Sequence, residues 1–163
     1  MKKIIFITLM TFLTANIFAQ NKLGHVNAQE ILFQMPAYKT AVNDLQQFQT
    51  NLENRLSGLL SELDQLRKSY EATASSLTDL EKQDKELEMQ SLYQRIETFQ
   101  ADAQELLQKE EQKLINPIQT ELLNAINEVA KEGNYTYILR DEVFLFANES
   151  NDVGDLVRKK LGL

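Results

Sequence analysis

The longest stretch without breaks sets the strongest limit on what this chain can fold into. Between Ala37 and Glu132 the only helix-breaking residues are Gly58 and Pro117, and the whole chain of 163 residues has five glycines and two prolines. A helix of a globular domain usually has about 11 or 12 residues. The sequence therefore predicts a few very long helices.

The first half of this stretch carries a single apolar stripe. Its members are Tyr38, Val42, Leu45, Phe48, Leu52, Leu56, Leu59, Leu63, Leu66 and Tyr70. Steps of three and four place them along one side of a helix, as in a coiled coil. Such a narrow stripe needs a partner helix to cover it.

The partner is expected in the same chain. Ser and Thr accumulate between residues 72 and 79, and Thr78 and Glu81 fit a capping box that starts a new helix near residue 79. That helix carries a second stripe: Leu80, Leu87, Leu92, Ile96, Phe99, Ala103 and Leu106. We predict an antiparallel helical hairpin over 37–116, a coiled-coil arm with its tip near 72–79.

Shorter elements flank the predicted arm. Residues 20–36 are expected to form a strand and a short helix stopped by Pro36. From Pro117, where we expect a kink, a helix should run to Gly133, followed by a β-hairpin of strands 135–140 and 143–147 and a last helix in 151–161. The fold class is α+β, mostly α. Because so few strands leave open edges, oligomerisation of this small body is expected.

The first 19 residues read as a signal peptide. Lys2 and Lys3 precede an apolar run from Ile4 to Ala15, and cleavage is predicted near Ala19. The alternative is a membrane anchor, but the run is shorter than the roughly 20 residues needed to span a bilayer. The mature chain is thus expected to be exported, without stable membrane insertion.

Composition excludes several kinds of site. The chain has no cysteine and one histidine, so a disulfide framework, a thiol nucleophile and a site with two imidazoles are ruled out. A formal net charge of −7 argues against nucleic acid as a partner. We predict no catalytic residue, no metal site and no cofactor.

Five segments together resemble the Skp/OmpH family of periplasmic chaperones. They are Lys22–Ala28, Ile31–Lys39, Thr78–Lys82, Ile126–Leu139 and Ser150–Leu156. The resemblance implies a homotrimer in which strands of three subunits form a β-barrel and three helical hairpins enclose a cavity. It also implies an ATP-independent holdase that keeps unfolded outer-membrane proteins from aggregating in the periplasm.

Charge is where the chain departs from its basic relatives. Residues 37–113 hold 15 acids and 9 bases, so a basic lipopolysaccharide-binding patch is not carried over. Capture of unfolded proteins should then depend on apolar contacts or on basic stretches of the bound chain.

Two sets of residues are candidates for these roles. For the oligomer body they are Val26, Ile126, Val129, Ile138, Leu139, Phe144 and Phe146. For contact with the unfolded protein they are Leu60, Leu77 and Met89, which we place outside the stripes, and Tyr93, which lies on or near one. Aromatic residues on or near the stripes, such as Phe48 and Phe99, are expected to be hairpin core rather than direct contacts of the unfolded protein. His25 is expected to be structural.

A second class of function stays open. The chain could be a structural coiled-coil protein of the envelope that docks on one fixed partner. Such a protein should show one further apolar stripe, and the sequence shows scattered apolar residues instead. An enzyme would need reactive groups gathered in a pocket, and no such pattern is visible.

Overall fold

The computed structural model describes residues 22–163, so the predicted signal peptide lies outside the described residues. The chain divides into two compact units. One comprises the described residues up to Ala28 together with Asn124–Leu163, and the other comprises Gln29–Leu123, which extends beyond the predicted arm of 37–116 at both ends. Most of the described chain is helical and there is one small sheet, in agreement with the predicted α+β class.

The unit Gln29–Leu123 contains one long helix and most of a second, whose residues from Asn124 onward belong to the other unit. Helix α2 (Ala28–Gln34) ends one residue before Met35, α3 (Pro36–Thr73) begins with a proline, and α4 (Asp79–Glu132) follows after a short turn. Proline suits the first position of a helix because its fixed φ fits there and its missing N–H would be unpaired anyway. Pro36 therefore separates α2 from α3, as predicted.

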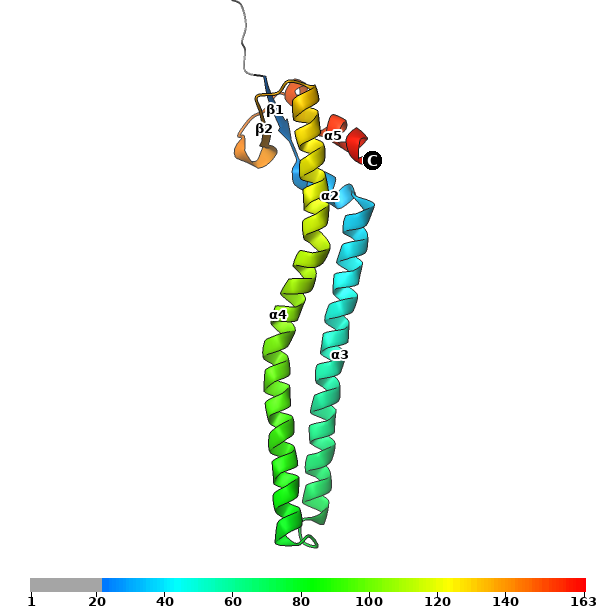
Figure 1. The fold of residues 1–163 in the computed structure, drawn as a ribbon, viewed down its shortest axis with the longest axis vertical. Helices are drawn as coiled ribbons and strands as arrows, with labels where there is room; N and C mark the ends of the chain where they lie inside the picture. The colour runs from blue at the N-terminus through cyan, green and yellow to red at the C-terminus, as the bar shows by residue number, and fades with distance from the viewer. Residues whose placement is uncertain (1–21) are drawn as a thin grey trace, which may run out of the picture. The chain divides into compact units, whose positions relative to one another are not determined.

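Helices α3 and α4 lie side by side and run in opposite directions (Figure 1). Leu63 of α3 forms a buried cluster with Leu92 and Ile96 of α4. Closer to the turn, the Tyr70 hydroxyl reaches the Glu86 carboxylate. The separation in sequence between contacting residues thus shrinks toward the turn, which defines the antiparallel direction.

The stripe of α3 follows the prediction at all but one position. Its members are buried or half-buried, from Tyr38 to Tyr70, while the positions between them are exposed. The exception is Val42, which is 41% exposed, whereas its neighbour Ala41 is 5% exposed. The smaller side chain faces inward at this end of the helix.

The predicted stripe of α4 is wrong at three leucines. Leu80, Leu87 and Leu106 are exposed, and the inward positions belong to Lys82, Lys85, Met89 and Leu107. The step from Leu87 to Leu92 is five residues, which breaks a spacing of three and four. Lysine can occupy the inward positions because its methylene stem covers apolar surface while the ammonium stays in water.

The start of α4 is the predicted capping box. The Thr78 amide donates to Glu81 Oε2 at 2.7 Å, and the Glu81 amide donates to Thr78 Oγ1 at 3.3 Å. Two helix-terminal amides are thereby satisfied. Farther along, α4 continues through Pro117 as one helix, so the predicted root of the arm is not a helix boundary.

The other unit contains a parallel pair of strands. Strand β1 (Leu23–Val26) pairs with β2 (Tyr137–Arg140), with Leu23 opposite Tyr137 and Val26 opposite Arg140. The predicted β-hairpin is therefore wrong: residues 143–147 form no strand. The chain instead turns after β2 in two 3₁₀ helices, η2 (Asp141–Val143) and η3 (Glu149–Asn151).

The core of this unit is built mainly from valines. Val26, Val129, Val153 and Val157 are buried, together with Ala125. Helix α5 (Gly154–Leu161) begins where the Asp152 carboxylate accepts a hydrogen bond of 2.7 Å from the Gly154 amide. It ends at Gly162, whose φ of 72° lies in the left-handed region.

Gly133 ends α4 for a reason other than its conformational freedom. The residue with positive φ is Asn134, at 51°. A Cβ on Gly133 would instead collide with the Tyr135 ring. That ring also stacks under the Lys22 ammonium, 4.0 Å from the ring centroid, and the same ammonium donates to the Gly133 carbonyl at 2.8 Å.

Candidate functional site

One face of the two-stranded sheet is apolar and open. Side chains alternate between the faces of a strand, so Leu23 and His25 lie on the same face as Tyr137 and Leu139, their partners in register. Leu23, Tyr137 and Leu139 are all exposed. On the opposite face, Val26 is buried, and Gly24 lies against Tyr135 and Val153. The sheet therefore has one covered face and one that water reaches.

The segment after β2 adds to this open surface. Val143, Phe144, Leu145 and Phe146 are all exposed, Leu145 completely. Exposure of four consecutive large apolar side chains is unusual, because a monomeric soluble protein rarely leaves a sizeable apolar patch in water. We call Val143–Phe146 the apolar loop.

His25 joins the apolar loop to β1. Its ring is buried, with 8% of the residue exposed. Nδ1 lies 2.7 Å from Asp141 Oδ1, Nε2 lies 3.0 Å from the Asn148 carbonyl oxygen, and the Phe144 ring meets the imidazole edge to face at 6.0 Å. The loop is therefore bracketed by two residues, Asp141 and Asn148, that both contact His25.

The pKa of His25 is raised above its usual value of 6.5. The main cause is the hydrogen bond to the Asn148 carbonyl, while burial acts in the opposite direction. The hydrogen bond and charge of Asp141 and the charge of Asp152 raise the pKa further. The structural role predicted for His25 agrees with these contacts.

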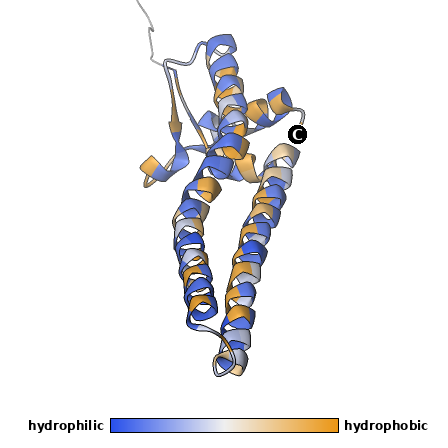
Figure 2. Ribbon diagram, turned by 60° about the horizontal axis from the view of Figure 1, so that its bottom comes forward, coloured by the Kyte–Doolittle hydropathy of each residue, from blue (hydrophilic) through white to orange (hydrophobic). Residues whose placement is uncertain are grey.

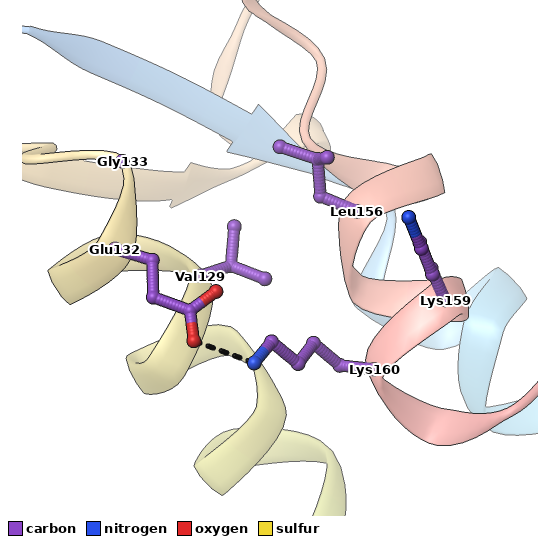
Figure 3. A pocket seen from close by; sticks show the side chains of 6 residues that line it. All are labelled: Val129, Glu132, Gly133, Leu156, Lys159 and Lys160. Carbon is purple, nitrogen blue, oxygen red and sulfur yellow. Dashed lines mark hydrogen bonds and ion pairs between the residues drawn. The ribbon is translucent and has the colours of Figure 1, made fainter.

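A shallow hollow lies between the end of α4 and α5 in the same unit (Figure 3). It measures about 600 Å³ and is lined by Val129, Glu132, Gly133, Leu156, Lys159 and Lys160. The Lys160 ammonium lies 2.6 Å from Glu132 Oε1 and 3.4 Å from Glu128 Oε2. The hydrogen bond to Glu132 is the main reason that the pKa of Lys160 is raised. These pairs tie α5 to α4.

In the long-helix unit, hydrophilic and hydrophobic residues are mixed along both long helices (Figure 2). Seven large apolar side chains lie exposed along α3 and α4 there: Val42, Leu60, Leu80, Leu87, Tyr93, Leu106 and Leu123. They do not fall at the spacing of one helical stripe. The surface also carries ion pairs within single helices, such as Arg67 with Glu71 and Lys113 with Glu110. Pairs of this kind contribute little to stability.

The four residues proposed for contact with an unfolded protein differ in how exposed their side chains are. Leu60 and Tyr93 are exposed, and Leu77 is half-buried in the turn between the helices. Met89 does not lie outside the stripes as predicted, because it packs against the cluster of Leu63, Leu92 and Ile96. Leu80 and Leu87 were missed, although the five-residue step after Leu87 is a signal in the sequence.

The residues proposed for the oligomer body also differ in exposure. Val26 and Val129 are buried in the core of the single chain, at 2% and 3% exposure. They have no free surface for contact with another subunit. Ile126 and Ile138 are half-buried, whereas Leu139, Phe144 and Phe146 are exposed. The exposed three lie on the open sheet face and the apolar loop.

Residues 22–163 show neither a metal centre nor a membrane-spanning element. No group of three or more His, Asp or Glu side chains in this range is placed to hold a metal ion. No helix in the same range is long and apolar enough to cross a membrane.

Comparisons with known proteins place the chain in a family. The model of the OmpH family, outer membrane proteins of the OmpH-like kind, matches residues 22–161. A crystal structure of an OmpH-like protein from Caulobacter crescentus, described as an outer membrane chaperone, has a similar fold, with a TM-score of 0.77. It is 18% identical, and the match covers 88% of this chain and 85% of the other. No curated protein is significantly similar in sequence. Since the family model spans nearly the whole described chain, the chain belongs to the OmpH-like family.

Proposed function

We propose that this protein is an ATP-independent holdase that binds unfolded outer-membrane proteins in the periplasm and prevents their aggregation. The observation that carries the proposal is the exposed apolar surface of the long-helix unit. Seven large apolar side chains of this unit stand in water along α3 and α4 without forming a stripe for one partner helix. Scattered contacts suit a chain without fixed structure, whereas a docking partner would require a continuous face.

The chemistry of the bound protein fits this surface. An unfolded β-barrel precursor exposes apolar side chains and unpaired strand edges, both of which promote aggregation. Many weak contacts can hold such a chain together through effective concentration. Because each contact is weak, release requires no nucleotide. Membership of the OmpH-like family supports the same function.

The working form that we propose is a homotrimer whose small sheets join into a barrel. Within the described residues β2 pairs with β1 alone, so its other edge is free for a strand of another subunit. The open sheet face, with Leu139, and the apolar loop, with Phe144 and Phe146, would be covered in that assembly. Covering them removes the apolar patch from water.

The holdase proposal is tested by diluting a urea-unfolded outer-membrane β-barrel into buffer with the chain from residue 20 onward. Turbidity should fall as the chain is added, and light scattering should find a complex of three copies with one unfolded protein. An acidic helical protein of similar size, at the same concentration, serves as the control. Unchanged turbidity, together with a monomer at micromolar concentration, would contradict the proposal.

The trimer has its own test. Phe146→Ser should weaken assembly in sedimentation experiments, because Phe146 is 85% exposed in the single chain and its loss should not disturb the chain's own core. Leu60→Ser, also at an exposed apolar position but on α3, is the control and should leave the assembly unchanged. Equal effects of the two substitutions would count against the sheet unit as the site of assembly.

A further inference from the structure

The contacts of His25 determine how many protons its ring carries. Its two ring nitrogens face Asp141 Oδ1 at 2.7 Å and the Asn148 carbonyl oxygen at 3.0 Å. An ionised carboxylate and a carbonyl can only accept a hydrogen bond. A neutral imidazole has a single N–H, and it would leave one of these oxygens against a nitrogen lone pair. Only the imidazolium can donate to both.

We propose that His25 is a doubly protonated latch that holds the apolar loop against the sheet. Nδ1–H donates to Asp141 before the loop, and Nε2–H donates to Asn148 after it. When the pH rises, a proton leaves the ring to solvent and one of these two hydrogen bonds is lost. The apolar loop is then held at one end only.

Other contacts confine the effect to the loop. The Val153 amide donates to the backbone carbonyl of His25 at 2.9 Å, and the strands pair through their backbones from Leu23 to Val26. Neither interaction depends on the state of the ring. Opening the latch should therefore leave the sheet and α5 in place and release residues 142–147.

The charges around the ring favour the imidazolium. Asp141 of η2 and Asp152, which follows η3, are the charged groups that act on His25, and both are negative. The remaining neighbour, the Phe144 ring, is uncharged. Burial opposes the charge, yet the pKa is raised overall. A group whose pKa is raised by folding stabilises the fold fully below its unfolded value, here 6.5, and loses that contribution as the pH rises through the folded value.

The latch depends on the geometry of one unit and not on the holdase proposal. It concerns the position of the apolar loop, whatever later covers it. The two can fail separately, because the protonation of His25 is measured without any bound protein.

Because His25 is the single histidine of the chain, its imidazole signals in NMR spectra need no assignment. A pH titration of the mature protein, with ¹⁵N spectra of the ring, should show both nitrogens protonated at pH 6.5 and a pKa above 6.5. The steady-state ¹H–¹⁵N NOE of residues 143–147 should fall through the same midpoint. A neutral ring with one N–H at pH 6.5, or loop signals that do not follow the titration, would overturn the latch.

Two further variants separate the latch from general charge effects. Asp141→Asn should lower the pKa of His25 and leave the apolar loop mobile at every pH. Glu142→Gln removes the same charge one residue away, at an exposed position, and should change the pKa less. Equal changes in both variants would show that His25 responds to net charge alone. Since Asp141 is partly exposed, its substitution should leave the fold intact, as the α-helical circular dichroism will verify.

Discussion

The Tyr70 hydroxyl donates a hydrogen bond of 2.9 Å to the Glu86 carboxylate and so connects α3 to α4 near the turn between them. The hydrogen bond to Glu86 is the main cause that raises the pKa of Tyr70, and desolvation and the charge of Glu86 raise it further, so the phenol stays protonated and able to donate. Few other polar contacts between the two helices accompany it in the described chain. This bond should therefore limit fraying at this end of the pair.

Tyr70→Phe should loosen the turn without unfolding the protein. The ring keeps its half-buried position while the donor is lost. We expect faster amide hydrogen exchange in residues 66–90 and almost no change in the urea midpoint, since the bond is exposed to solvent. Tyr93→Phe is the control, because it removes the hydroxyl of a different tyrosine, which lies on α4. If exchange in both variants matches the wild type, the bond does not hold the turn.

Replacement of two glycines by alanine should change the stability of the protein in opposite directions. A Cβ at Gly58 in α3 meets nothing within 4 Å, so Gly58→Ala should raise the free energy of unfolding by about 0.5–1 kcal/mol through the better helix propensity of alanine. At Gly133 the added methyl collides with the Tyr135 ring, so Gly133→Ala should lower the free energy of unfolding. Urea denaturation of both variants tests the pair. Stabilisation by Gly133→Ala would mean that the ring moves aside freely.

The capping box should make the stability of the protein depend on pH in the acidic range. The Thr78 amide and hydroxyl both donate to Glu81 and lower the pKa of its carboxyl below the usual 4.5. A group whose pKa is lowered by folding stabilises the fold above its unfolded value and loses that contribution as the pH falls through the folded value. Glu81→Gln should therefore be less stable than the wild type at neutral pH, and the difference should vanish in strong acid.

Thr78→Ala tests the other half of the box. It should cost about 1 kcal/mol at neutral pH, the usual effect of removing an N-cap side chain. It should also weaken the acid dependence, because Glu81 loses the hydroxyl donor. Urea denaturation at several pH values measures both effects. An acid dependence that persists unchanged would assign it to other carboxylates.

The stripes show how far the sequence alone could predict the long helices. On α3 nearly every inward residue is a large apolar one, so the spacing from Leu45 to Tyr70 identifies the buried side directly. On α4 the inward positions near the turn are Lys82 and Lys85. A pattern of apolar residues cannot mark a position that a lysine stem fills, so it assigned Leu80 and Leu87 wrongly.

The sheet unit was harder to predict because its contacts span the whole chain. Residues 143–147 have the composition of a strand, but composition does not supply a partner, and β2 uses β1 instead. For the same reason the bond from His25 to Asp141, 116 residues away in sequence, could not be foreseen. The sequence indicated a structural role for His25 without indicating its partners.

Two exposed leucines of α4 lie near the turn and are candidates for contact with an unfolded protein. Leu80 and Leu87 are 68% and 55% exposed and lie seven residues apart, so they share one side of the helix. If the holdase proposal is right, Leu80→Ser with Leu87→Ser should weaken the holding of an unfolded β-barrel several-fold, because two apolar contacts are lost. Stability should hardly change, since neither side chain is in the core.

Gln83→Ser with Gln90→Ser is the matched control for the leucine pair. These residues have the same spacing on the same helix, are exposed, and contribute no large apolar surface. Light scattering during dilution of the urea-unfolded protein compares the two double variants at equal concentration. If both suppress aggregation as well as the wild type, α4 near the turn is not a binding surface. If both double variants suppress aggregation equally poorly, the effect comes from the serines and not from lost apolar contact.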